Sequence, residues 1–180
     1  WDMVIRQRIF DPLGMTRSYV NRTPPYLAAH RSNRYYVEKD SAGTAAPRAA
    51  GPEFDPGVTI PNGGWNAPMD DLATWIGFLT GTTRGVVRAD SLLDRTTLAE
   101  MWTAVVPVGR GEGVVETMGL GFFLYAVNGR HLVGHTGDQG GFRSFMAFDP
   151  ASGQGVIGVV NTSNDVDSQA SGRGFTSLFR

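Results

Sequence analysis

The sequence contains no cysteine and only one lysine, Lys39, among its 180 residues. The absence of cysteine excludes disulfides, thiolate catalysis and cysteine-ligated metals. No apolar run approaches the roughly 20 residues that a membrane-spanning helix needs. The net charge of −1 gives no electrostatic reason to expect a nucleic acid or an anionic membrane as a partner. We therefore expect no membrane span and no nucleic-acid partner.

The length and the hydrophobic content of 41% predict one domain, residues 1–180, with a real core. Residues 1–110 are predicted to be mainly helix and loop. Residues 111–180 are predicted to form an antiparallel sheet followed by the start of a C-terminal helix near residues 175–179. Helices first and an antiparallel sheet afterwards indicate the fold class α+β, an antiparallel sheet with flanking helices.

Three stretches have the apolar periodicity of helices. The first covers residues 1–10 and is expected to end at Asp11-Pro12. The second starts at Pro68 and ends at Gly81, and the third starts at Asp94 as its N-cap and ends before Pro107. The predicted buried positions are Met69, Leu72, Ala73, Ile76 and Leu79 in the second helix, and Leu98, Met101, Trp102 and Val105 in the third.

The remaining segments are predicted as loops and strands. Residues 16–60 contain several prolines and are expected to be irregular. A segment of this length is either a functional loop or contains helices or strands that the sequence pattern does not reveal. Asn128-Gly129 is a strong hairpin signal. Period-two alternation and short turns predict a four-stranded antiparallel meander from residues 118–127, 131–136, 142–148 and 156–160.

Polar groups gather where one of these strands ends. His135-Thr136-Gly137 comes just before a turn that contains Gly140 and Gly141. Backbone N–H groups at such a strand edge can stabilise a developing oxyanion, and a hydroxyl and an imidazole beside them can bind or relay protons. On this tripeptide alone, a hairpin end with incidental polar residues is the simpler interpretation.

Metal and cofactor sites are not expected. His131 and His135 lie four residues apart on one strand and hence on one face, but a metal would need a third ligand. Only scattered candidates such as Asp138 and His30 are present, so His131 is interpreted as a structural or rim histidine. Asp165 and Asp167 have incomplete spacing for a calcium loop and are interpreted as a solvated turn.

The chain shows no self-contained catalytic set. Gly-x-Ser-x-Gly is absent, and so is Ser-x-x-Lys, because Tyr36 stands three residues before the only lysine. A Walker loop, His-Glu-x-x-His and a usable Gly-x-Gly-x-x-Gly are also absent.

Five segments nevertheless form a pattern that extends over nearly the whole chain, although each segment is weak alone. The segments are residues 9–18 (IFDPLGMTRS), 61–75 (PNGGWNAPMDDLATW), 119–122 (GLGF), 134–150 (GHTGDQGGFRSFMAFDP) and 156–161 (VIGVVN). In order and spacing they resemble the serine β-lactamase-like hydrolases, which include class C β-lactamases, penicillin-binding DD-peptidases and β-lactamase-fold esterases. The departures from the family pattern include Asn62 and Asn66.

The resemblance implies that His135-Thr136-Gly137 corresponds to the family's third motif, which is Lys-Thr-Gly in β-lactamases and His-x-Gly in many esterases and peptidases. The backbone N–H of Asp138 would then be one arm of the oxyanion hole. The Ser-x-x-Lys nucleophile and Tyr-x-Asn motifs of the family precede the segment that starts near residue 9. They would lie upstream of Trp1, so the chain is expected to be the C-terminal portion of such a protein.

The expected function is therefore that of the C-terminal part of a serine hydrolase, which acts on a small-molecule ester, amide or peptide through an acyl-enzyme. Histidine in place of lysine argues against β-lactamase activity and favours an esterase or peptidase. Asp138 is expected to place a negative charge near the acyl site and to repel anionic substrates. The resemblance also favours a periplasmic or secreted location over a cytoplasmic one.

Without its upstream segment, the chain alone is expected to be inactive. Two alternatives remain open: a non-catalytic β-lactamase-like domain that binds or senses a ligand, and one half of a split protein that partners an N-terminal chain.

Overall fold

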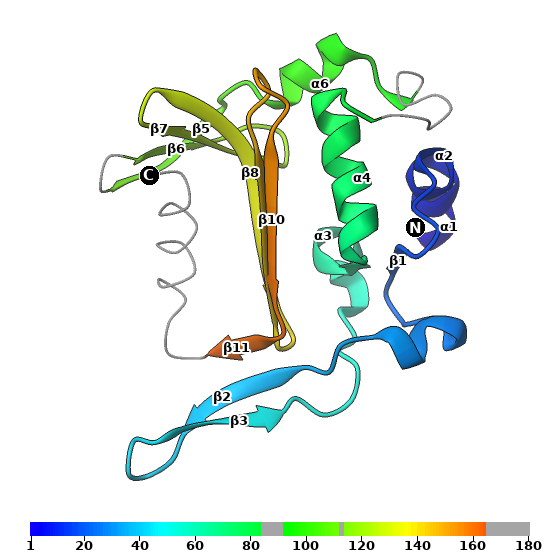
Figure 1. Ribbon diagram of the computed structural model, residues 1–180, viewed down its shortest axis with the longest axis vertical. Coiled ribbons are helices and arrows are strands. Elements are labelled where there is room, and N and C mark those ends of the chain that lie inside the picture. Colours follow the sequence, from blue (N-terminus) through cyan, green and yellow to red (C-terminus); the bar gives the residue numbers. More distant parts are fainter. Residues whose placement is uncertain (84–91, 112–113, 165–180) are drawn as a thin grey trace.

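The protein is described by a computed structural model that covers residues 1–83, 92–111 and 114–164. Its elements form layers that Figure 1 shows side by side: an antiparallel sheet, the long helix α4 (Met69–Thr80) and an N-terminal helical segment. A hairpin projects from the lower end of these layers. The predicted fold class, α+β with an antiparallel sheet and flanking helices, is confirmed.

The N-terminal segment is a helix that continues through Asp11-Pro12, so the predicted end at these residues is wrong. It consists of α1 (Asp2–Ile5), the π-helical turn η1 (Arg6–Phe10) and α2 (Asp11–Leu13). In the π turn the N–H of Asp11 donates to the carbonyl five residues back. We infer that this wider turn admits the proline ring, which would clash with a carbonyl in a regular α-helix. The helix ends at Gly14, which has a left-handed φ of 70°.

Residues 16–60 are not a structureless loop, and the alternative that the pattern hides regular elements is confirmed. They contain a hairpin of β2 (Tyr35–Lys39) and β3 (Ala45–Ala49), which pair antiparallel. Pro47 lies inside β3, a position that an edge strand tolerates because its missing N–H can face away from the partner strand. The segment also contains β1 (Tyr19–Val20), η2 (Pro25–His30) and η3 (Gly57–Thr59), and it leads into α3 (Ile60–Gly63) and β4 (Trp65–Asn66), which pairs with β1.

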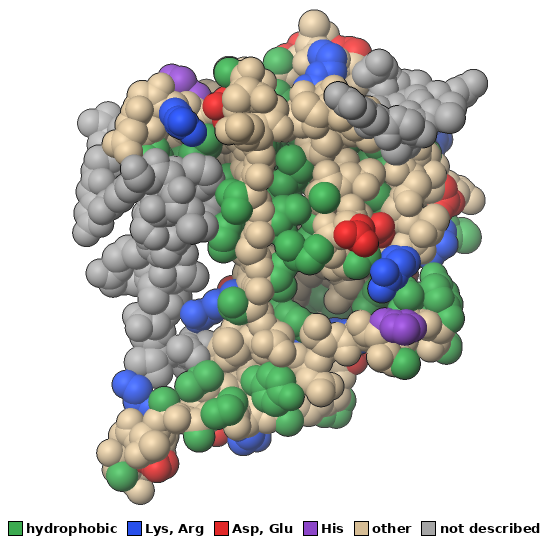
Figure 2. All heavy atoms as spheres, viewed as in Figure 1, with side chains coloured by type: hydrophobic (Ala, Val, Ile, Leu, Met, Phe, Trp, Pro, Cys, Tyr) green, Lys and Arg blue, Asp and Glu red, His purple; other side chains and the backbone are tan. Residues whose placement is uncertain are grey.

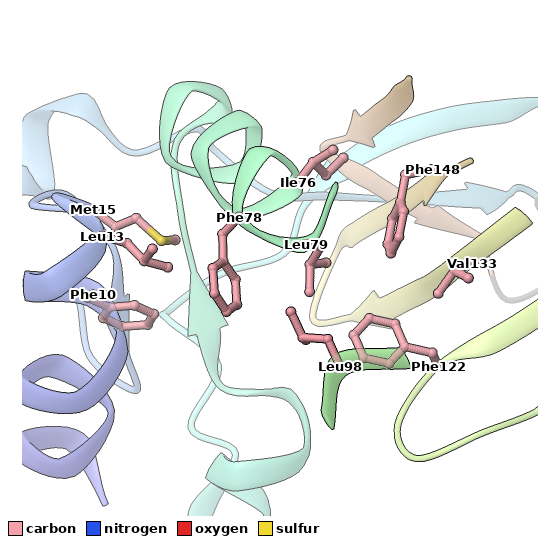
Figure 3. Packing of buried hydrophobic residues seen from close by; sticks show 10 residues of the cluster. All are labelled: Phe10, Leu13, Met15, Ile76, Phe78, Leu79, Leu98, Phe122, Val133 and Phe148. Carbon is pink, nitrogen blue, oxygen red and sulfur yellow. The ribbon is translucent and has the colours of Figure 1, made fainter. Parts of the chain in front are cut away.

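Helix α4 has the predicted bounds and ends at Gly81, whose φ is 74°. Its predicted face is wrong in part, because Met69 and Ala73 are exposed. The structural reason is that α4 lies between two layers, so residues on two of its sides are covered. Figure 3 shows Phe78 on the side of the N-terminal segment and Ile76 and Leu79 toward the sheet. The buried residues of the helix are Asp71, Ile76, Phe78 and Leu79.

Helix α6 (Arg95–Met101) begins as predicted, with the side chain of Asp94 accepting a hydrogen bond from the N–H of Thr97. Leu98 is buried, and Met101 and Trp102 pack partly against the same core. Val105 was predicted to be buried but is 64% exposed, because the helix ends at Met101 and the chain turns into the first strand of the sheet.

The sheet has six strands in the described part of the chain, in the order β10-β9-β8-β7-β6-β5, which is an antiparallel meander. The predicted single strand 118–127 is wrong, because β6 ends at Met118 and Gly121 turns the chain with a φ of 74°. The predicted hairpin at Asn128-Gly129 is confirmed by their φ angles of 51° and 76°. The strands are β5 (Val106–Gly111), β6 (Val114–Met118), β7 (Phe123–Val127), β8 (Arg130–Gln139), β9 (Phe142–Phe148) and β10 (Gly155–Val160).

After β10 the chain adds β11 (Thr162–Asn164), which pairs parallel with β2 and so connects the hairpin to the end of the sheet. No helix among the described residues is long and apolar enough to cross a membrane. The predicted C-terminal helix at 175–179 and the acidic residues Asp165 and Asp167 lie outside the described residues.

Candidate active site

The candidate site lies at the far end of β8, where the strand has a neighbour on one side only. Pairing with β7 ends at Phe123 and Gly134, whereas pairing with β9 continues to Gln139 and Phe142. Within the described part of the chain, residues 135–139 therefore form an open edge of the sheet. Strand β8 is longer than predicted, and the turn after it uses the left-handed φ angles of Gly140 and Gly141, 54° and 87°.

His135 is the exposed imidazole of this edge. Its Nδ1 lies 2.6 Å from the backbone carbonyl oxygen of Thr136, and its ring lies against Phe123 with centroids 5.1 Å apart. A carbonyl oxygen can only accept a hydrogen bond, so Nδ1 of the neutral ring carries the proton and Nε2 has a free lone pair. In the neutral tautomer that this contact selects, Nε2 can accept a proton from another group.

Asp138 makes contacts that the sequence does not reveal. Its Oδ2 accepts a hydrogen bond of 2.8 Å from Nε of Arg143, and its Oδ1 accepts one of 3.0 Å from the hydroxyl of Ser163. Arg143 is directly opposite Asp138 in the β8–β9 pair, and Ser163 is in β11. The negative charge that was expected to stand near the acyl site is therefore paired with a guanidinium. The expectation that it repels anionic substrates loses its physical basis.

At Gly137 and Gly63, a neighbouring side chain comes so close to the backbone that a Cβ atom would not fit. A Cβ on Gly137 would meet the hydroxyl oxygen of Ser144 at 2.8 Å, and a Cβ on Gly63 would meet the side-chain oxygen of Gln139 at 2.8 Å. The second contact places the end of α3 against the end of β8. Two of the segments that carry the family resemblance thus meet at this edge.

A cleft of about 1340 Å³ adjoins this edge. It brings together all four residues predicted from the sequence, His135, Thr136, Gly137 and Asp138, along one wall. Figure 2 shows hydrophobic side chains between the sheet and α4, above the β2–β3 hairpin. The other walls come from the 17–34, 54–56 and 62–69 segments and the start of α4, and they include Arg17, Leu27, His30, Arg34, Phe54, Asn62, Trp65, Asn66, Met69 and Leu72.

Ser144 and Arg34 are among the polar residues of this cleft that sequence reasoning missed. Ser144 is exposed on β9 opposite Gly137, and Arg34 reaches the cleft from the residue just before β2. The alternation of β9 could have indicated the side of the sheet on which Ser144 lies, but nothing in the local sequence signals Arg34. The residues of the described part of the chain contain no group of three or more His, Cys, Asp or Glu side chains that could hold a metal ion.

Comparison with known proteins agrees with the fold. The Beta-lactamase family model matches residues 1–176, and the chain belongs to this family. A comparison with curated protein sequences finds no match.

Among solved structures, the chain is similar to the octameric penicillin-binding protein homologue from Pyrococcus abyssi, with 25% identity, a TM-score of 0.68, and coverage of 90% of this chain and 34% of that one. It is also similar to the D-amino acid amidase from Ochrobactrum anthropi SV3, with 23% identity, a TM-score of 0.68, and coverage of 91% and 44%. A D-alanine carboxypeptidase from Burkholderia cenocepacia is 16% identical, with a TM-score of 0.67 and coverage of 99% and 55%. The chain thus has a β-lactamase fold but spans only about a third to a half of these proteins.

Proposed function

We propose that these 180 residues are the C-terminal part of a serine hydrolase that cleaves an ester or amide through an acyl-enzyme. The observation that carries the proposal is the exposed imidazole of His135, with Nε2 free, at an open strand edge that borders a large cleft. Membership of the beta-lactamase family and the amidase and carboxypeptidase among similar structures support a hydrolytic role.

The nucleophile comes, in this proposal, from a segment of the same protein that precedes Trp1. The chain has a single lysine and no serine three residues before it, so it cannot supply the Ser-x-x-Lys pair itself. The serine hydroxyl adds to the substrate carbonyl, the alcohol or amine leaves with a proton, and water then releases the acid and restores the serine. Each step transfers a proton near the reacting carbon.

The residues at the end of β8 serve that chemistry in distinct ways. The N–H of Asp138 donates to the oxyanion that forms when the carbonyl is attacked, and the ion pair with Arg143 holds this part of the backbone in place. Nε2 of His135 and the hydroxyl of Thr136 bind the substrate and relay protons. The substrate is a small-molecule ester, amide or peptide, and no cofactor takes part.

The experiment compares two histidines of the same strand in the native gene product. His135→Ala is expected to lower kcat/KM for a nitrophenyl ester about 100-fold, the order of magnitude of a lost proton-transfer group. His131→Ala is the matched control, because His131 is exposed on β8 and does not line the cleft, and its variant should stay within about twofold of the wild type. Equal kcat/KM in the two variants would contradict the role of His135.

The chain of 180 residues alone should show no saturable turnover of the same ester, because it lacks the nucleophile. Saturable turnover by this chain would mean that the nucleophile lies within it. A well-folded native protein that binds the ester without hydrolysing it would instead favour a ligand-binding or sensor domain of the same fold.

A further inference from the structure

Arg34 is an unusually buried cation for a residue beside a cleft. Its relative exposure is 8%, and it stands just before β2. Its guanidinium donates hydrogen bonds to the carbonyl oxygens of Gly51, Pro52 and Gly140. These acceptors belong to two different loops, so the side chain bridges the 51–52 segment and the turn after β8.

The charge of this guanidinium is not balanced by a carboxylate in the described residues. The three ion pairs found there join Arg31 to Glu53, Arg48 to Glu38, and Arg143 to Asp138, and none includes Arg34. Removing a full charge from water costs several kcal/mol, and neutral carbonyl dipoles offset this only in part. An anion that binds beside Arg34 would supply the missing opposite charge.

The cleft around Arg34 has an excess of positive charge, although the chain as a whole carries −1. Its described lining includes three arginines, Arg17, Arg31 and Arg34, and one acidic residue, Asp138. The Asp138 carboxylate is engaged by Arg143, and Arg31 is engaged by Glu53. Arg17 and Arg34 therefore leave this cleft attractive to anions.

We propose that Arg34 is an anion subsite of the cleft and binds a carboxylate of the ligand. Phe54 adjoins the same turn and is 46% exposed, so it can cover an apolar part of the ligand. A role of this subsite in placing a substrate for cleavage rests on the proposed function, whereas the anion subsite itself does not.

Binding of two matched ligands tests the subsite without any need for hydrolysis. Phenylacetate carries a carboxylate, and phenylacetone is its neutral ketone counterpart; calorimetric titration of the native gene product measures both dissociation constants. The wild type should bind phenylacetate at least about 10-fold more tightly than phenylacetone, as expected for a charge-assisted hydrogen bond. Arg34→Gln should abolish this preference and leave the affinity for phenylacetone unchanged.

Two further variants separate a binding role from a purely structural one. Arg34→Lys keeps the charge but not the planar fork, so it should weaken phenylacetate binding several-fold, and it gives the answer even if Arg34→Gln does not fold. Arg48→Gln, which removes an exposed arginine outside the cleft, should change the preference less than about twofold. The subsite is refuted if the wild type shows no preference, or if either folded Arg34 variant keeps the wild-type preference.

These results are independent of catalysis. If the native protein hydrolyses no ester but shows the Arg34-dependent carboxylate preference, the proposed function fails and the subsite stands. If esters are hydrolysed but the carboxylate preference is absent, the proposed function stands and the subsite fails.

Discussion

The carboxylate of Asp138 lies 2.8 Å from the guanidinium of Arg143, its direct partner across the β8–β9 pair, and it also accepts a hydrogen bond from Ser163 in β11. One side chain thus ties together three strands at the point where the backbone N–H of residue 138 adjoins the cleft. The ion pair thus neutralises the charge of Asp138 and also holds the backbone of residue 138 in place.

Asp138→Asn should lower the free energy of unfolding by about 1 kcal/mol, because the side chain is 46% exposed and solvent weakens such a pair. The loss should shrink at high salt, which screens the remaining attraction in the wild type. Urea denaturation of the native gene product at low and high salt measures both effects. Glu38→Gln is the control, since the Glu38–Arg48 pair is more exposed on both sides, and it should cause no measurable change. Equal losses in the two variants would contradict the account.

Asp71→Ala should lower the free energy of unfolding by about 2 kcal/mol. The buried Asp71 carboxylate accepts hydrogen bonds from the Ser18 hydroxyl and the Arg17 N–H, and its loss leaves the hydroxyl buried without an acceptor. Its exposed neighbour provides the control, and Asp70→Ala should stay within about 0.5 kcal/mol of the wild type. Chemical denaturation compares the two, and similar losses would show that Asp71 acts only through the helix N-terminus.

Gly134→Ala should destabilise the protein by about 3 kcal/mol, since the new Cβ would stand 2.3 Å from the carbonyl oxygen of Met146 and the backbones of β8 and β9 would have to separate. Gly109→Ala on β5 is the matched control, because nothing lies within 4 Å of its Cβ position. Thermal or urea unfolding distinguishes the two variants. A Gly134→Ala protein as stable as Gly109→Ala would show that the strands can part at little cost.

The N-cap of α6 should make stability depend on pH in the acid range. Hydrogen bonds from the Thr96 hydroxyl and then from Thr97 lower the pKa of Asp94 from 3.8 to about 2. A carboxylate with a lowered pKa stabilises the fold fully above its unfolded pKa and loses this effect as the pH falls toward its folded pKa. The stability difference between the wild type and Asp94→Ala should therefore be constant above about pH 5 and shrink between pH 4 and 2. Denaturation curves measured at steps of pH check this, and a difference that persists unchanged at pH 2 would contradict it.

The sequence correctly predicted those features that depend only on residues close together in the chain. Asp94 caps a helix whose N–H groups follow within three residues, and Asn128-Gly129 closes a hairpin through its own φ angles. At the end of β8 the local pattern was not sufficient: on its own it favoured an incidental hairpin end, and the family resemblance supplied His135 to Asp138, which the structure places along one cleft. Their catalytic roles remain proposals.

Longer-range contacts account for what the sequence could not show. The sequence did not predict β3 because the strand contains Pro47, and proline is usually excluded from strands. Proline is tolerated here because β3 is at the edge of its sheet. Asp71 looked like a helix-start charge but is buried through Ser18, 53 residues earlier. Arg34 contacts Gly140 across 106 residues, a relationship that no local pattern contains.

The central claim is that this chain belongs to a working serine hydrolase, and labelling of the native gene product with a fluorophosphonate probe tests it most directly. The labelled protein is digested, and the modified peptide is sequenced by mass spectrometry. The account predicts a label on a serine that is followed three residues later by lysine, in sequence that precedes Trp1. A well-folded native protein that takes up no label would contradict it.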